Sequence, residues 1–346
     1  MRIRALFAAG LLLSLGACSP PPAPTEPPFT GVWVGPLPVS ATEQRPFAIV
    51  IHERAGRELM GHVLGGTSQR LIMGGFRSGD NALLLFETRD GGIAGPISLS
   101  GAVSGDTLTG NAMLGSDNFP VTWTRHADPL EVRSFIFAGS MGGGGEPAEL
   151  AIVRDASGAL VAGNFTSSDC SFIECGAAVT SFAEAPTGAL TIVLATDGPC
   201  PGTATLNASF DAATFFYSGT WSHTDGGACG GATTGGSLIG GRDLGTRSTD
   251  AASVLANLGQ LADDLEAGAT FTAPHAALSP GYLHFGQTAA GFLAALNAEV
   301  AAHAGADISF HSFTAIRTVT PTGHHPLLPS ALGVTFADTR RDAAGV

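Results

Sequence analysis

The sequence contains no lysine, although it is 346 residues long. Without lysine the chain cannot carry the phosphate-binding lysine of a P-loop, a Schiff-base lysine or a Ser-x-x-Lys nucleophile pair. The motifs Gly-x-Ser-x-Gly and His-Glu-x-x-His are missing as well, and so are a dinucleotide-binding glycine motif after a strand and an Asp-rich calcium loop. We therefore predict no catalytic residues and no cofactor.

Positive charge is also scarce. The chain has 16 basic residues against 29 acidic residues, which gives a formal net charge of −13 at pH 7. Nucleic-acid binding depends on a basic surface that neutralises phosphates. We therefore expect no nucleic-acid partner.

The only long apolar run near the N-terminus spans residues 5–15 and follows two arginines, Arg2 and Arg4. A membrane-spanning helix needs about 20 apolar residues, so this run is too short to cross a bilayer. A short apolar run behind positive charge is typical of a secretory signal. We assign residues 1–17 to a signal peptide.

The end of this signal, Leu15-Gly16-Ala17-Cys18, resembles the lipobox of bacterial lipoproteins. The resemblance implies cleavage before Cys18 and a palmitate-type diacylglyceryl group on its sulfur, which anchors the exported protein in a membrane. Ser19 after the cysteine implies the outer membrane if the host is Gram-negative. Residues 18–28 then form a lipid-bearing, proline-rich linker. The alternative is an ordinary secretory signal with a cysteine nearby.

Five cysteines are an odd number for an exported protein, but a lipid on Cys18 leaves four. In an oxidising compartment we expect two disulfides among Cys170, Cys175, Cys200 and Cys229. Three connectivities exist, and we favour Cys170–Cys175 with Cys200–Cys229 because the first two are near neighbours. A four-cysteine zinc site is the alternative, but the spacing lacks a paired knuckle, so we predict no metal.

Short alternating segments separated by Gly and Asp-Gly turns predict strands over residues 47–51, 58–64, 83–87, 97–103, 107–113, 121–125, 190–194, 204–210 and 214–221. We assign residues 29–126 to one antiparallel β domain and residues 131–245 to a second one that carries the disulfides. The two are related, because the order apolar strand, glycine turn, strand ending in glycine in residues 47–61 recurs in residues 150–163. The predicted fold class is mainly β, with two tandem antiparallel β-barrel or sandwich domains followed by a small α+β C-terminal region.

The first β domain resembles lipocalin-like and avidin-like barrels. The resemblance rests on Gly31-Val32-Trp33 on the opening strand and Trp123-Thr124-Arg125 on the closing strand. It implies that Trp33 fills one end of a barrel and that Arg125 lies over its ring. A second Gly-x-Trp occurs at Gly219-Thr220-Trp221.

Residues 246–346 form the α+β region. Helical spacing of apolar residues predicts one helix that is capped by Thr249 and Asp250 and ends before Gly268, and a second helix over 288–303. Two strands should follow, over 308–320 and 332–336. They either belong to this region or complete the second sheet.

Histidines are concentrated in this last region: His275, His284, His303, His311, His324 and His325. Histidine ligates metals and moves protons near neutral pH, although these spacings match no metal motif. We expect a cell-envelope lipoprotein that acts as a binding or assembly module, with a protein or a small apolar ligand as partner. The alternative is an exported hydrolase or metal-dependent enzyme with its site among these histidines.

Overall fold

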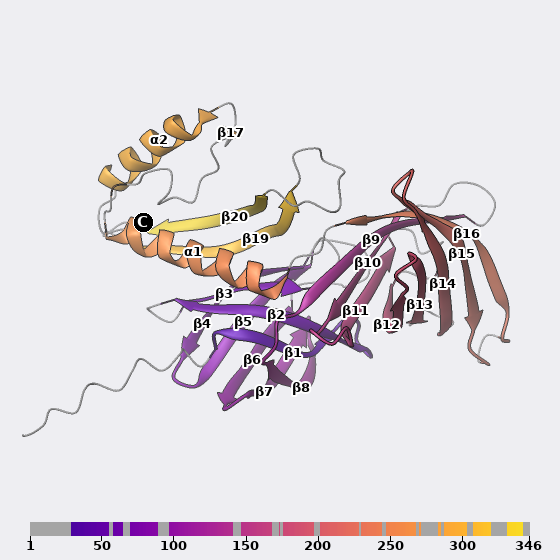
Figure 1. Cartoon of the computed structure of the whole chain (residues 1–346). Coiled ribbons are helices and arrows are strands. Elements are labelled where there is room, and N and C mark those ends of the chain that lie inside the picture. Colours follow the sequence, from indigo (N-terminus) through magenta and orange to yellow (C-terminus); the bar gives the residue numbers. More distant parts are fainter. Residues whose placement is uncertain are drawn as a thin grey trace, which may run out of the picture.

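A computed structural model shows two β-barrels in succession, followed by helices and a long hairpin (Figure 1). The described residues are 29–341 without 55–57, 65–69, 89–96, 141–146, 168–172, 174–175, 197–200, 228–229, 244–246, 268–269, 271–282, 285–286, 303–306 and 320–330. Within these residues, no helix has both the length and the apolar character needed to cross a membrane.

Barrel 1 consists of eight antiparallel strands in sequence order, and β8 pairs with β1 to close it. The strands are β1 (Gly31–Pro38), β2 (Gln44–Arg54), β3 (Glu58–Leu64), β4 (Arg70–Ser78), β5 (Asn81–Thr88), β6 (Ile97–Ser104), β7 (Thr107–Leu114) and β8 (Asp117–His126).

Barrel 2 repeats this arrangement, and β16 pairs with β9 to close it. Its strands are β9 (Glu131–Ser140), β10 (Pro147–Arg154), β11 (Leu160–Ser167), β12 (Gly176–Glu184), β13 (Ala189–Thr196), β14 (Gly202–Asp211), β15 (Phe216–Asp225) and β16 (Thr233–Asp243). The predicted internal repeat corresponds to the second and third strands of each barrel, β2–β3 and β10–β11.

Side chains alternate between the inside and the outside of each barrel, as the pleat of a strand requires. In β8, Val121 and Trp123 are buried inside barrel 1, whereas Thr122 and Thr124 are exposed. Aromatic and aliphatic side chains, including Phe135, fill the inside of barrel 2 in the same way. Large side chains on the inner faces therefore supply the two main cores.

The remaining elements are α1 (Ser248–Glu266), β17 (Leu283–His284), β18 (Gln287–Thr288), α2 (Ala289–Ala302), β19 (Asp307–Val319) and β20 (Ala331–Arg341). Both predicted helices are confirmed within two residues at each end. The hairpin β19–β20 is a sheet of its own, so the idea that its strands complete the second sheet is wrong, because β9 already closes that barrel. The predicted fold class is confirmed.

The start of α1 differs from the predicted cap. The helix begins at Ser248, one residue before Thr249, so Thr249 and Asp250 lie in its first turn. The Ser248 hydroxyl accepts a hydrogen bond from Leu130 N, and Ser248 N donates to Leu130 O. The contact with Leu130, 118 residues away, therefore fixes where the helix starts.

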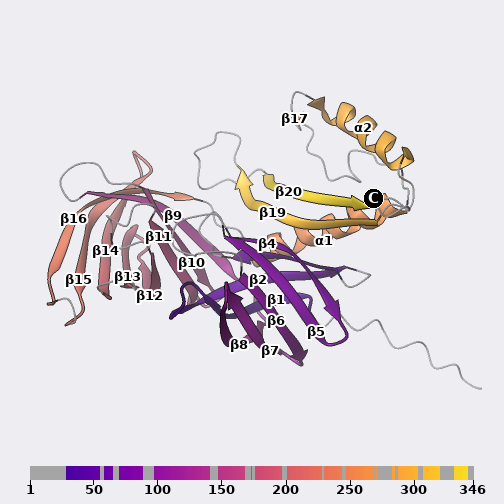
Figure 2. The same cartoon turned by 180° about the vertical axis from the view of Figure 1, so that it is seen from behind.

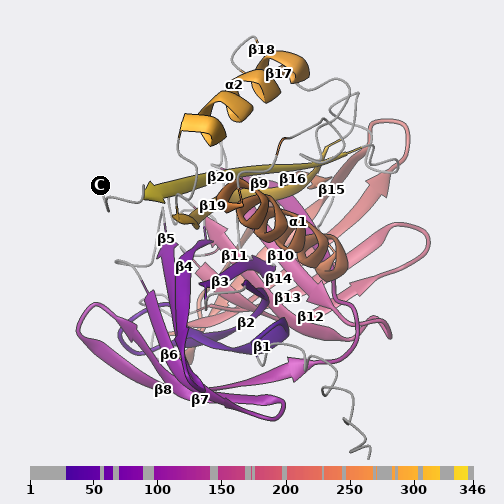
Figure 3. The same cartoon turned by 90° about the vertical axis from the view of Figure 1, so that its left-hand side faces the viewer.

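A third cluster of buried residues joins the parts of the molecule. It takes side chains from the outer face of β2 and β3, from β9 to β11 and the residue before β9, and from α1: Ala48, Val50, Met60, Leu64, Leu130, Val132, Val153, Ala162, Ala251 and Leu255. Helix α1 lies over the strands where the barrels meet (Figure 3). The view from behind shows the β19–β20 hairpin running along α1 beside β4 (Figure 2). The outer wall of barrel 1 at β2, β3 and β4 is therefore covered.

Four strands of the two barrels were not predicted: β4, β9, β12 and β16. Two of them contain glycine pairs, Gly74-Gly75 in β4 and Gly235-Gly236 in β16, which weaken the alternating apolar pattern. The register of β4 also shifts between Ile72 and Gly75. Pairing with long neighbours, rather than local pattern, makes these segments strands.

Candidate functional site

One end of barrel 1 is sealed by Trp33 and Arg125. The guanidinium carbon of Arg125 lies 4.5 Å from the centre of the Trp33 ring, and Trp33 Nε1 donates to Phe29 O at 2.9 Å. Arg125 Nη1 also donates to Thr30 O. A Cβ at Gly31 would lie 2.6 Å from Arg125 Nη1, so glycine is needed for this close approach. The predicted position of Arg125 over Trp33 is confirmed.

An ion pair completes this sealed end. Arg77 Nη1 lies 2.5 Å from Glu53 Oε1, and the Glu53 side chain is only 7% exposed. The Arg77 guanidinium lies over the Phe29 ring at 5.8 Å. Phe29, Trp33 and Trp123 are almost completely buried at or near this end. These residues therefore act as a plug.

A buried polar chain lies at one end of barrel 2. Thr196 Oγ1 is 3.1 Å from His223 Nε2, and His223 Nδ1 is 3.5 Å from Asp225 Oδ1. This is the order of groups found in nucleophilic hydrolases. However, Thr196 Oγ1 also accepts the Gly202 N–H at 2.8 Å, and Thr196 is only 6% exposed. We assign the chain a structural role, because its hydroxyl is buried and already bonded to the backbone.

In the sequence, the predicted disulfide cysteines all fall in connections between neighbouring strands of barrel 2. Cys170 and Cys175 lie between β11 and β12, Cys200 between β13 and β14, and Cys229 between β15 and β16. All four lie outside the described residues, as does Cys18. Pro201 directly follows Cys200 and Gly226 lies three residues before Cys229, and Gly226 N donates to Pro201 O at 2.8 Å.

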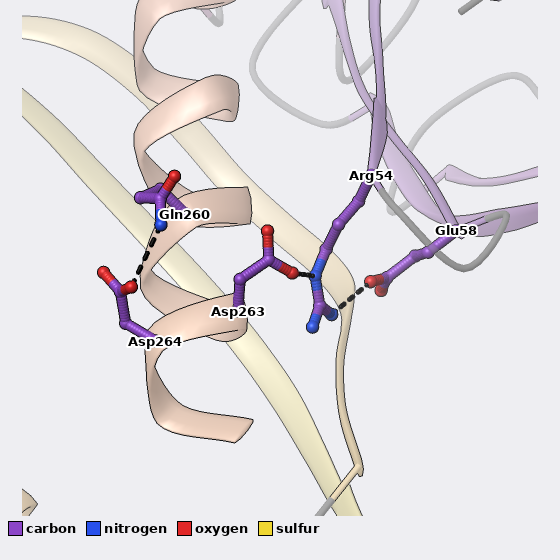
Figure 4. Close-up of polar contacts among 5 residues, drawn as sticks. All are labelled: Arg54, Glu58, Gln260, Asp263 and Asp264. Atoms are coloured by element: carbon purple, nitrogen blue, oxygen red, sulfur yellow. Dashed lines mark hydrogen bonds and ion pairs between the residues drawn. The ribbon is translucent and has the colours of Figure 1, made fainter. Parts of the chain in front are cut away.

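Helix α1 is held on barrel 1 by Arg54 (Figure 4). Arg54 Nε donates to Asp263 Oδ1 at 2.7 Å, and its Nη1 donates to Glu58 Oε2 at 2.8 Å. The Arg54 side chain is 4% exposed, whereas the Asp263 side chain is 42% exposed. Gln260 and Asp264 bond to each other on the helix. Arg54 therefore joins strands and helix 209 residues apart in the chain.

Two histidines lie on the same outer face of β2 and β3. A Cβ at Gly259 of α1 would lie 3.0 Å from both His52 Nε2 and the Met60 methyl group. Burial lowers the pKa of His52, although the carboxylates of Asp263 and Glu53 oppose this effect. Burial also lowers the pKa of His62 to about 4. The docked helix thus favours neutral imidazoles.

The hairpin β14–β15 ends in exposed aromatic side chains. Phe215 and Phe216 are 41% and 52% exposed, and the Phe215 ring meets that of Phe210 edge-on at 6.4 Å. Phe215 has a φ of 61°, which is rare for a bulky residue. Asp211 fixes the turn: its carboxylate accepts from Ala213 N and the Thr214 hydroxyl, and its carbonyl accepts from Phe215 N. We call Phe215 and Phe216 the aromatic tip.

The predicted site among the C-terminal histidines lies outside the side chains that the structure describes. His284 and His311 lie in strands, but no side chain of the six is among the described positions. Across the part of the chain that the structure describes, no group of three or more metal-binding side chains occurs.

The fold consists of two closed eight-stranded antiparallel barrels, with α1 and the β19–β20 hairpin covering part of barrel 1. No protein-family model and no curated protein sequence matches the chain. A crystal structure of an AttH-designated protein from Nitrosomonas europaea is similar at 11% identity, over 60% of this chain and 90% of that chain, with a TM-score of 0.19. A similarity this weak assigns no activity to this chain.

Sequence reasoning missed the aromatic tip and the Arg54 contacts. The doublet Phe215-Phe216 directly after a turn that starts with Asp211 is a usable signal, because Asp favours turns and adjacent aromatics cannot both point into a barrel. The sequence around Arg54 and Asp263 contains no local pattern that would predict their pairing.

Proposed function

We propose that this chain is a lipid-anchored cell-envelope protein that acts by binding or assembly through the surface of its tandem barrels. The lipobox resemblance at Cys18 supports the anchor, with the outer membrane as its location if the host is Gram-negative. The contact of Arg125 with Trp33 supports a relationship of barrel 1 to lipocalin-like or avidin-like barrels.

The observation that carries a binding role is the aromatic tip. Two adjacent phenylalanines are 41% and 52% exposed, and Phe215 is held in a backbone conformation that costs about 1–3 kcal/mol. Exposed aromatic side chains that are fixed in place are typical anchors of protein interfaces. We favour a protein partner over a small apolar ligand, because large side chains fill the inside of both barrels.

The partner surface should be apolar with a basic rim. Asp211 at the base of the turn is fully exposed, and its hydrogen bonds with Ala213 and Thr214 lower its pKa, so it stays charged. The net negative charge of the whole chain also favours a partner with basic residues around its binding surface.

Photo-cross-linking in the native host tests this function. A photoreactive residue in place of Phe216 should give one dominant cross-linked species. The same residue in place of Thr220, an exposed residue on the same strand, should give much less of it. Equal yields at the two positions, or none at Phe216, would contradict a binding role for the tip.

The alternative, an exported hydrolase or metal-dependent enzyme among the C-terminal histidines, stays a prediction. Metal analysis of the purified protein and substitution of His324 and His325 test it. It requires bound metal or an activity that these substitutions reduce.

A further inference from the structure

The outer wall of barrel 1 carries ionisable groups beneath a cover that is not part of the barrel. The cover consists of α1, which packs on β2 and β3, and of the β19–β20 hairpin, whose β19 packs on β3 and β4. Below α1 lie the apolar side chains of Val50, Met60 and Leu64, which belong to the third buried cluster. His52 and His62 alternate with these residues on the same outer face, because side chains two apart in a strand share a face.

From these contacts we propose that the cover is released from barrel 1 when His52 and His62 become protonated, exposing the apolar face of β2 and β3. The release would act as an acid-sensitive switch. It needs no partner to start it, and it does not depend on the lipid anchor.

The geometry disfavours a charged imidazole at His52. Helix α1 approaches so closely at Gly259 that a single added carbon would lie 3.0 Å from His52 Nε2. The helix backbone thereby excludes water from one side of the His52 ring. His52 also pairs across the sheet with Met60, which offers no hydrogen-bond acceptor except a weak thioether.

The elements packed around the two histidines carry further charged groups. Asp263 of α1 and Glu53 of β2 favour protonation of His52, but burial is the larger effect and lowers its pKa. For His62, burial alone lowers the pKa to about 4. Further ionisable groups of these elements are Arg54 and Glu58 at the Asp263 contact, and Asp307, His311 and Arg317 in the sequence of β19.

The direction of the pH effect follows from these shifts. A histidine whose pKa is lowered in the covered state stabilises that state above its ordinary pKa of about 6.5, and this stabilisation is lost as the pH falls toward the lowered value. For His62 alone, a shift from 6.5 to about 4 weakens docking about tenfold at a pH of about 5.5, if released His62 regains its ordinary pKa. His52 acts in the same direction.

Hydrogen exchange of the full mature chain tests the proposal. Protection of the α1 amides, corrected for the intrinsic exchange rate, should fall at least about tenfold between neutral pH and a pH of about 5.5. Barrel 2 amides serve as the internal reference and should keep their protection. The double variant His52→Gln/His62→Gln should retain α1 protection at the lower pH, whereas His126→Gln, which replaces a histidine of β8, should behave as the wild type.

Equal loss of protection in the wild type and in the double variant would overturn the proposal, because the carboxylates would then be the cause. If the double variant already lacks α1 protection at neutral pH, a second measurement decides whether the histidines act as proposed. Imidazole titration of the wild type by NMR should show His52 and His62 titrating below 6.5, in step with the loss of α1 protection; titration at ordinary pKa values would also overturn it.

Discussion

Arg125 makes two contacts at once at the sealed end of barrel 1, with the face of the Trp33 ring and with the carbonyl of Thr30. Both partners lie on or next to the opening strand, whereas Arg125 lies on the closing strand. The side chain therefore fastens the first and last strands of the barrel where they meet. Its Nε also lies 3.3 Å from the exposed carboxylate of Asp106, a contact worth little in water.

Replacing Arg125 with Gln should lower the free energy of unfolding of barrel 1 by about 2 kcal/mol. The substitution removes a cation–π contact and a charge-assisted hydrogen bond, each worth about 1–2 kcal/mol. Urea denaturation followed by tryptophan fluorescence measures the change. The matched control Arg247→Gln, at an exposed position before α1, should change stability by less than about 0.5 kcal/mol. Equal stability of the two variants would show that the contact does not hold the barrel closed.

At this scale the Trp33–Arg125 contact was expected from the resemblance of the first and last strands to those of lipocalin-like barrels. The sequence did not allow the contact of Arg54 with Asp263 to be predicted. That contact depends on how α1 crosses the barrel wall, and 209 residues separate the partners. Phe215 lay inside a segment read as strand, and its positive φ is set by the hydrogen bonds of the Asp211 turn rather than by its own preference.

Helix α1 is an element whose own sequence does not explain its position. Its buried side includes Ala251 and Leu255, which join the cluster between the barrels, and Gly259, which allows contact with His52 and Met60. Glycine in the middle of a helix costs roughly 0.5–1 kcal/mol relative to alanine. Close packing on barrel 1 offsets this cost.

Replacing Gly259 with Leu should therefore undock α1. The added side chain has no room between the helix and β2, because even its first carbon would lie 3.0 Å from His52. Hydrogen exchange should show loss of protection across α1 while β14 and β15 stay protected. The size-matched control Gln260→Leu places the same side chain on the exposed face of the helix. If Gly259→Leu leaves α1 protected, the close approach at this glycine is not essential for docking.

Element by element, the two helices and most strands were predictable because their apolar periods are regular. The strands that were missed, β4, β9, β12 and β16, show that a barrel can impose extended structure on a segment with a poor pattern. Closure explains this best for β16, a glycine-rich strand that pairs with β15 on one side and with β9 on the other. Its backbone hydrogen bonds, rather than its side chains, define it.

For the whole molecule, the four cysteines after Cys18 give a testable prediction about barrel 2. We expect Cys200–Cys229 and Cys170–Cys175, because β14 and β15 are joined by hydrogen bonds out to Pro201 and Gly226. Peptide mapping without reduction should find these two pairs. Reduction should destabilise barrel 2 by about 2–4 kcal/mol for a typical disulfide, and barrel 1 much less. Free thiols in the protein recovered from an oxidising compartment, or cross-pairing of Cys170 with Cys229, would contradict this arrangement.

The membrane anchor is the central claim about the molecule, and palmitate labelling of the full precursor in a bacterial host tests it most directly. The wild type should incorporate the label and sediment with membranes, whereas Cys18→Ser should do neither. Cys200→Ser is the matched control, because it also removes one thiol and should keep the label. An unlabelled wild type that sediments as Cys18→Ser does would contradict a lipid on Cys18.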